Sequence, residues 1–133
     1  RKGLLDGAEK AITERLRKSP VEPDLLFKQA LLLALRGKFP QGEARVPDLL
    51  ARIQLNSLRR HHATYDAAGI YALAGNAAEA VKWLMETANI GFPNYALFER
   101  DPFLNRIRTK PEFIQFMSDQ KAHWEKLRVE LGP

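Results

Sequence analysis

The chain has 133 residues, of which 45% are hydrophobic and 28% charged, and these values are typical of one folded domain and exclude a wholly disordered chain. It contains no cysteine, which excludes disulfides and thiolate metal sites and favours a reducing, cytoplasmic location. The longest strongly apolar run, Ala30 to Leu35, is too short to cross a bilayer, and no signal peptide is visible, so we expect no membrane partner.

The N-terminal half predicts three helices. Leu4, Ala8, Ile12 and Leu16 recur every four residues and indicate a helix from Leu4 to Lys18, closed by Ser19 and Pro20. Because the chain begins at Arg1 inside this pattern and without an initiator methionine, we expect it to be a piece of a longer protein. The second and third helices are expected at 24–36 and 42–56, with Pro47 either in the first turn or at a kink.

The segment 61–89 predicts two helices joined by a tight turn, at 61–74 and 77–89. Gly75 suits the left-handed conformation that ends a helix, and Asn76 followed by Glu79 is a helix-start signature. Ala68 and Ala80 are small enough to let two helix backbones meet. The pattern therefore predicts an antiparallel helix hairpin.

The C-terminal segment predicts two short helices and a long one. A helical turn is expected at 95–99, and Asp101 before Pro102 opens a short helix that reaches about Arg108. Thr109 and Glu112 have capping-box spacing before a helix that extends to about Leu131. We expect that long amphipathic helix to cover the apolar end of the preceding helices; its apolar face comprises Phe113, Phe116, Met117, Trp124, Leu127 and Leu131.

An internal similarity links the two halves of the helical region. Placing Gly37 over Gly75 also aligns Phe27 with Tyr65 and Ala30 with Ala68, so one constant offset relates all three pairs. Helix-turn-helix repeats of about this period are typical of α-solenoids, of which the tetratricopeptide repeat of about 34 residues is the nearest template. The offset is slightly longer than that template, and we expect the additional residues to lie at 39–46 and around Arg59.

On these residues the chain resembles tetratricopeptide-repeat proteins over 4–93. It also resembles the repeat-terminating region at the C-terminal end of bacterial signalling proteins, in the segments 71–75, 80–84, 91–95, 98–103 and 111–113. Such regions follow serine/threonine kinase, winged-helix regulator or cyclase domains. The resemblance implies an all-α, right-handed superhelix of helix hairpins over 1–93, with 94–133 as short helices and a long capping helix of the same domain. It also implies a protein-protein interaction role in a larger cytoplasmic bacterial signalling protein, whose upstream domain, process and ligand the sequence leaves open.

In such a solenoid the first helix of each repeat lines a concave groove. The resemblance therefore implies that a peptide of a partner, or of the same protein, binds there, and the predicted contact residues are Asp24, Phe27, Leu31, His62, Tyr65 and Gly69. The basic and asparagine residues of the family's carboxylate clamp are absent from these positions, which favours an apolar or aromatic-anchored peptide. The alternative is that Phe27, Leu31 and Tyr65 pack under the C-terminal helix.

Chemistry other than binding is not indicated. His61 and His62 are adjacent and so lie on different sides of a helix, which argues against a shared metal ion, and no phosphate loop, nucleophile elbow or carboxylate pair is present. We predict no enzyme activity, no cofactor and no metal. Two alternatives to peptide binding stay open: self-association, and a nucleic-acid surface on Arg59, Arg60 and 106–110, which the net charge of +5 permits.

Overall fold

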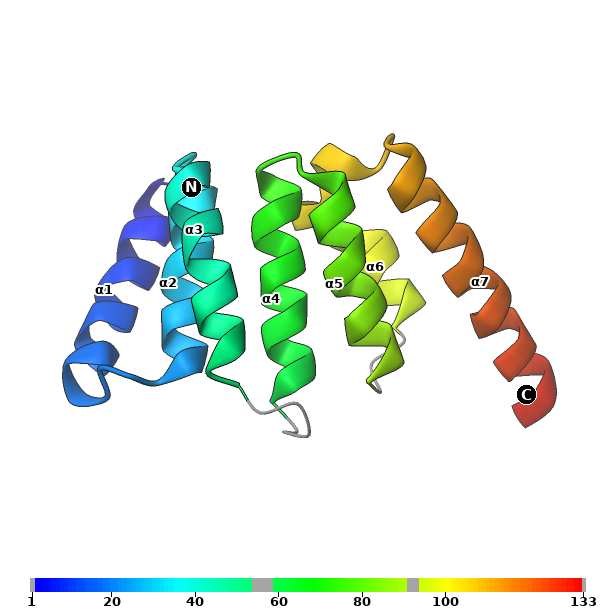
Figure 1. Ribbon diagram of the computed structural model, residues 1–133, viewed down its shortest axis with the longest axis horizontal. Coiled ribbons are helices and arrows are strands. Elements are labelled where there is room, and N and C mark those ends of the chain that lie inside the picture. Colours follow the sequence, from blue (N-terminus) through cyan, green and yellow to red (C-terminus); the bar gives the residue numbers. More distant parts are fainter. Residues whose placement is uncertain (1, 54–58, 91–93, 133) are drawn as a thin grey trace.

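The computed structural model describes residues 2–53, 59–90 and 94–132. Over these ranges the chain is helical and has no strand, as the sequence predicts. The helices stand side by side in an elongated row, with α1 at one edge and α7 at the other (Figure 1). Their bounds are α1 Lys2–Lys18, α2 Pro23–Leu35, α3 Phe39–Ala51, α4 Arg60–Leu73, α5 Ala77–Asn89, α6 Tyr95–Arg100, the 3-10 helix η1 Pro102–Ile107 and α7 Pro111–Leu131.

Two hairpins, α2–α3 and α4–α5, share the same turn. Gly37 and Gly75 have φ angles of 83° and 82°, in the left-handed region that glycine adopts without steric cost. The N–H of Gly75 donates to the Ala72 carbonyl and that of Asn76 to the Tyr71 carbonyl, and the equivalent pair of bonds closes α2. The predicted glycine turn is therefore confirmed, as is the Asn76 cap, whose side chain accepts the Glu79 N–H at 3.3 Å.

The repeat is more regular than the sequence pattern predicts. The offset that places Gly37 over Gly75 also places both ends of α3 over the ends of α5. The prediction of extra residues at 39–46 and of a helix beginning at Gly42 is wrong, because α3 begins at Phe39, with Pro40 in the first turn where its missing N–H costs nothing. Pro47 lies inside this helix. The residues that lengthen the repeat thus follow Ala51, and 54–58 are outside the described ranges.

Small side chains allow the helices of each hairpin to meet. In the α4–α5 hairpin Ala68 and Ala80 are both 0% exposed, which confirms that they are buried where these two helices pack together. The equivalent pair in the α2–α3 hairpin is Ala30 and Gly42, and a Cβ built on Gly42 would lie 3.0 Å from the Ala30 carbonyl oxygen. An alanine at position 42 would therefore have to shift its neighbours by a few tenths of an ångström, whereas the second hairpin has an alanine at the equivalent position.

The crossing of α4 and α5 leaves no room for a large side chain at position 80. Replacing Ala80 with Leu should lower the free energy of unfolding by about 1–3 kcal/mol, because the added carbons must displace the α4 backbone or adopt strained rotamers. Ala78→Leu is the matched control, since Ala78 lies on the same helix but is exposed. Urea denaturation measures both, and equal stability of the two variants would show that this crossing is looser than described.

Buried polar groups join the two helices of the second hairpin to each other and to the end of α3. The Thr64 and Thr87 hydroxyls are hydrogen-bonded to each other at 2.7 Å between α4 and α5. Arg60 is only 7% exposed, forms an ion pair with Glu86 at 2.9 Å, and donates to the carbonyls of Leu50 and Ile53 at 3.2 and 3.5 Å. One side chain thus connects α4 to α5 and to the end of α3.

The C-terminal elements close the other side of the row. The Asp101 carboxylate accepts the Phe103 N–H at 2.9 Å, so the predicted helix start at Asp101 is confirmed. The predicted capping box at Thr109 is wrong: α7 begins after Lys110, with no side-chain cap and with a proline in its first turn. α7 packs through Phe113 and Phe116, whereas its terminal Leu131 is 81% exposed and so does not belong to the packed face.

Candidate peptide-binding surface

The six predicted contact residues lie on α2 and α4, which pack against each other. Phe27 and Leu31 are only 1% and 9% exposed, and Gly69 is buried as well. A Cβ on Gly69 would touch Leu31 at 3.8 Å and Phe103 of η1 at 3.9 Å. Phe27, Leu31 and Gly69 are therefore buried and do not line an open groove, contrary to the expectation. At Gly69 the covering element is η1, whereas the alternative envisaged the long C-terminal helix.

Tyr65 is half-buried and joins α4 to the covering elements. Its ring stacks on Phe98 of α6 with centroids 5.8 Å apart, and its hydroxyl donates to the Asp101 carboxylate. Burial, followed by the hydrogen bond to Asp101, raises the pKa of Tyr65 well above its ordinary value. Arg108 binds the carbonyl of Asp101 at 2.7 Å and so holds the same junction. Sequence reasoning treated Asp101 only as a helix cap and missed this role.

Asp24 and His62 lie in a polar cluster on the same two helices. Asp24 pairs with Arg59 at 3.7 Å, and Lys28 pairs with Asp66 at 2.9 Å. Burial raises the pKa of the Asp66 carboxyl, and the neighbouring Lys28 partly offsets that effect. Within the described residues these four charged side chains form two ion pairs, so the cluster offers a peptide polar contacts and little apolar area. A peptide-binding role for Asp24 and His62 stays a prediction.

An open hollow of about 710 Å³ lies farther along this face, and we call it the α2–η1 hollow. Its volume is in the range of ligand-binding clefts. Four helices and η1 contribute side chains to it: Lys2 and Leu5 of α1; Ala34 and Leu35 of α2 with Arg36 and Gly37 of the turn; Phe39 of α3; Leu73 of α4; and Pro102, Phe103, Asn105 and Arg106 of η1.

The wall of the α2–η1 hollow combines apolar side chains with basic ones. Arg106 is fixed in place, because its Nη1 donates to the Leu73 carbonyl at 3.0 Å and its guanidinium lies 4.8 Å from the centre of the Phe39 ring. Lys2 and Arg36 are the other cations of the wall, and none of its described residues is an Asp or a Glu. Such a surface can bury apolar groups and attract a negative charge.

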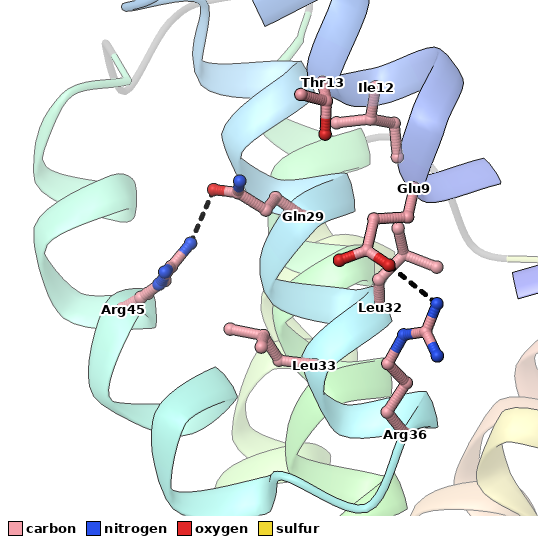
Figure 2. A pocket seen from close by; sticks show the side chains of 8 residues that line it. All are labelled: Glu9, Ile12, Thr13, Gln29, Leu32, Leu33, Arg36 and Arg45. Carbon is pink, nitrogen blue, oxygen red and sulfur yellow. Dashed lines mark hydrogen bonds and ion pairs between the residues drawn. The ribbon is translucent and has the colours of Figure 1, made fainter. Parts of the chain in front are cut away.

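A smaller pocket of about 80 Å³ lies between α1 and α2, beside α3 (Figure 2). Its polar groups pair with one another: Glu9 reaches Arg36 at 2.7 Å, and Arg45 reaches Gln29 at 2.6 Å. Asp6 also pairs with Arg36 at 2.7 Å. The ion pairs of Arg36 with Asp6 and Glu9 hold α1 on α2, and they fix Arg36 at the edge of the α2–η1 hollow.

Two of the arginines proposed for nucleic-acid contact are engaged within the protein: Arg60 is buried against Glu86, and Arg108 binds the carbonyls of Phe98 and Asp101. Arg106 is exposed and uses one of its donors on the Leu73 carbonyl. A nucleic-acid surface on this cluster stays a prediction. The described side chains also include no group of three or more His, Asp and Glu arranged to hold a metal ion.

Comparisons with known proteins do not identify this architecture: no family model matches the chain, and no curated protein or solved structure is significantly similar to it. The resemblance to tetratricopeptide repeats therefore stays an expectation. Among the helices in the described ranges, none combines the length and apolar character needed to cross a membrane.

Proposed function

We propose that this chain is a protein-protein interaction domain that binds a peptide segment of a partner in the α2–η1 hollow. The observation that carries the proposal is the apolar wall that stays open to solvent between α1, α2, α4 and η1, where Leu35, Phe39, Leu73 and Phe103 are only half-buried. Apolar and aromatic surface that is left open in a concave site is the usual feature of peptide recognition. This location replaces the middle of the α2–α4 face, where Phe27, Leu31 and Gly69 are buried.

The repeat supports a solenoid of the tetratricopeptide type. Two successive hairpins have the same glycine turn, the same small-residue crossing and a constant offset in sequence, and stacked hairpins of this kind form right-handed superhelices with a concave binding face. As the resemblance implies, we place the domain in a larger cytoplasmic bacterial signalling protein. The partner is then another protein, or the upstream domain of the same one.

A displayed library of random peptides tests the proposal. Peptides enriched on the immobilised domain should bind in solution, and Leu73→Gln should weaken that binding by about tenfold, because it places an amide in the apolar wall. Leu97→Gln is the matched control, since Leu97 is 36% exposed on α6 and is not part of the hollow. Circular dichroism and melting should show that both variants are folded.

The proposal fails in two cases. The first is that no peptide is enriched over an unrelated target protein. The second is that enriched peptides bind the Leu73 and Leu97 variants equally well, which would place the binding surface elsewhere.

A further inference from the structure

The α2–η1 hollow carries an imbalance of charge that bears on the kind of peptide it accepts. Its wall includes Lys2, Arg36 and Arg106, and the described part of the chain contributes no carboxylate to it. Arg36 is already neutralised by Asp6 and Glu9, which approach it from α1 and do not line the hollow. Lys2 and Arg106 form no ion pair with the described part of the chain, so they are the cations available to a ligand.

Arg106 is the better prepared of the two. One nitrogen of its guanidinium donates to the Leu73 carbonyl, and the guanidinium carbon lies 4.8 Å from the centre of the Phe39 ring. A guanidinium has five N–H donors, so this single bond leaves several of them for a ligand. Arg106 is exposed, so these donors are accessible from solvent.

The chemistry that matches such a group is a carboxylate. Arginine binds carboxylates through two parallel N–H···O bonds, and these bonds are stronger and more directional than neutral hydrogen bonds. The apolar side chains beside Arg106, which include Leu35, Leu73 and Phe103, require an apolar group next to that carboxylate. A nucleic acid offers phosphates but no aliphatic side chain for this wall, so the observations favour a peptide.

We infer that the α2–η1 hollow selects a peptide segment in which an Asp, a Glu or a C-terminal carboxylate stands next to a large apolar side chain, and that Arg106 binds the carboxylate. This inference rests on the proposed function, because it specifies the ligand of the same hollow. It assigns Arg106 a role in peptide recognition, whereas the sequence alone placed it in a basic cluster that could contact nucleic acid.

The test compares matched peptides on matched variants. An enriched peptide is synthesised with its Asp or Glu, and again with the corresponding Asn or Gln. Where the peptide has only a C-terminal carboxylate, the second form has an amidated C-terminus. We expect the acidic form to bind wild type about tenfold more tightly at low salt, and this advantage to shrink as salt is raised. Arg106→Gln should abolish the advantage, and Arg106→Lys should keep part of it, because lysine retains the charge without the paired donors.

Arg100→Gln is the control for a general loss of charge, since Arg100 is exposed on α6 and is not part of the hollow. It should leave the preference for the acidic peptide unchanged. A single-stranded oligonucleotide serves as a second probe, in competition with the fluorescein-labelled acidic peptide. If the oligonucleotide displaces the labelled peptide at a lower concentration than the unlabelled peptide does, the inference is overturned in favour of phosphate recognition.

The outcomes separate the two proposals. If enriched peptides depend on Leu73 but show no preference for acid over amide, or if Arg106→Gln keeps that preference, the carboxylate inference is wrong and the interaction function stands. If no peptide is enriched at all, both fail together.

Discussion

Replacing Phe98 with Ala should lower the free energy of unfolding by about 3–5 kcal/mol, the largest loss that we expect from a single substitution in this chain. Phe98 is 0% exposed, and its ring lies 5.8 Å from that of Tyr65 and 5.7 Å from that of Phe116. It therefore joins α6 to α4 on one side and to α7 on the other. Removing the ring leaves a cavity between Tyr65 and Phe116, and these side chains cannot fill it without a shift of α4 or α7.

The neighbouring Leu97→Ala is the control for this prediction, because Leu97 lies on the same short helix but is 36% exposed. It should cost about 1 kcal/mol or less. Urea denaturation followed by circular dichroism gives both values. Similar small losses for the two variants would mean that α6 is a loosely attached segment and not part of the core.

Replacing Arg60 with Ala should cost about 2–4 kcal/mol, because it removes one buried side chain that serves three acceptors. The carbonyls of Leu50 and Ile53 and the carboxylate of Glu86 would each lose a charged donor. Water can partly replace that donor at Glu86, whose side chain is 28% exposed, and we therefore place the loss below that of a fully buried pair.

Arg52→Ala gives the comparison for Arg60. Its ion pair with Asp48, at 3.0 Å, lies on the surface, with both side chains about half or more exposed, and exposed pairs contribute about 0–1 kcal/mol. Denaturant melts of the two variants in low and high salt separate the effects, since salt should erase the small loss at position 52 and leave most of the loss at position 60. Equal losses would contradict the central role of Arg60.

The helix hairpin could be predicted because its signals are local in sequence. A glycine after an apolar helix, an asparagine with a glutamate three residues on, and alanines at the crossing each act within a few residues of where they stand, and Gly75, Asn76 and Ala80 have the predicted roles. Local signals also misled at one point. Pro47 suggested a disturbed third helix with a late start, but Pro40 in the first turn marked the true start.

The candidate site could not be predicted in the same way, because it depends on a long-range fold. Phe27 and Leu31 would line a groove only if no other element covered α2 and α4, and no local sequence signal predicts where η1 will lie. The Leu73–Arg106 and Tyr65–Asp101 contacts each join α4 to positions beyond the whole of α5 and α6. Their side chains are ordinary for exposed helices, so only the packed structure shows that they meet.

The weak attachment of α1 has a kinetic consequence for the hollow. This helix has no fully buried residue and packs mainly against α2, so it can separate from the row at a far lower free-energy cost than unfolding the hairpins. Lys2 and Leu5 would leave with it, and the hollow would lose one wall. A bound peptide could then depart through this opening without any change in α4 or η1, and its residence time would follow the opening rate of a single helix.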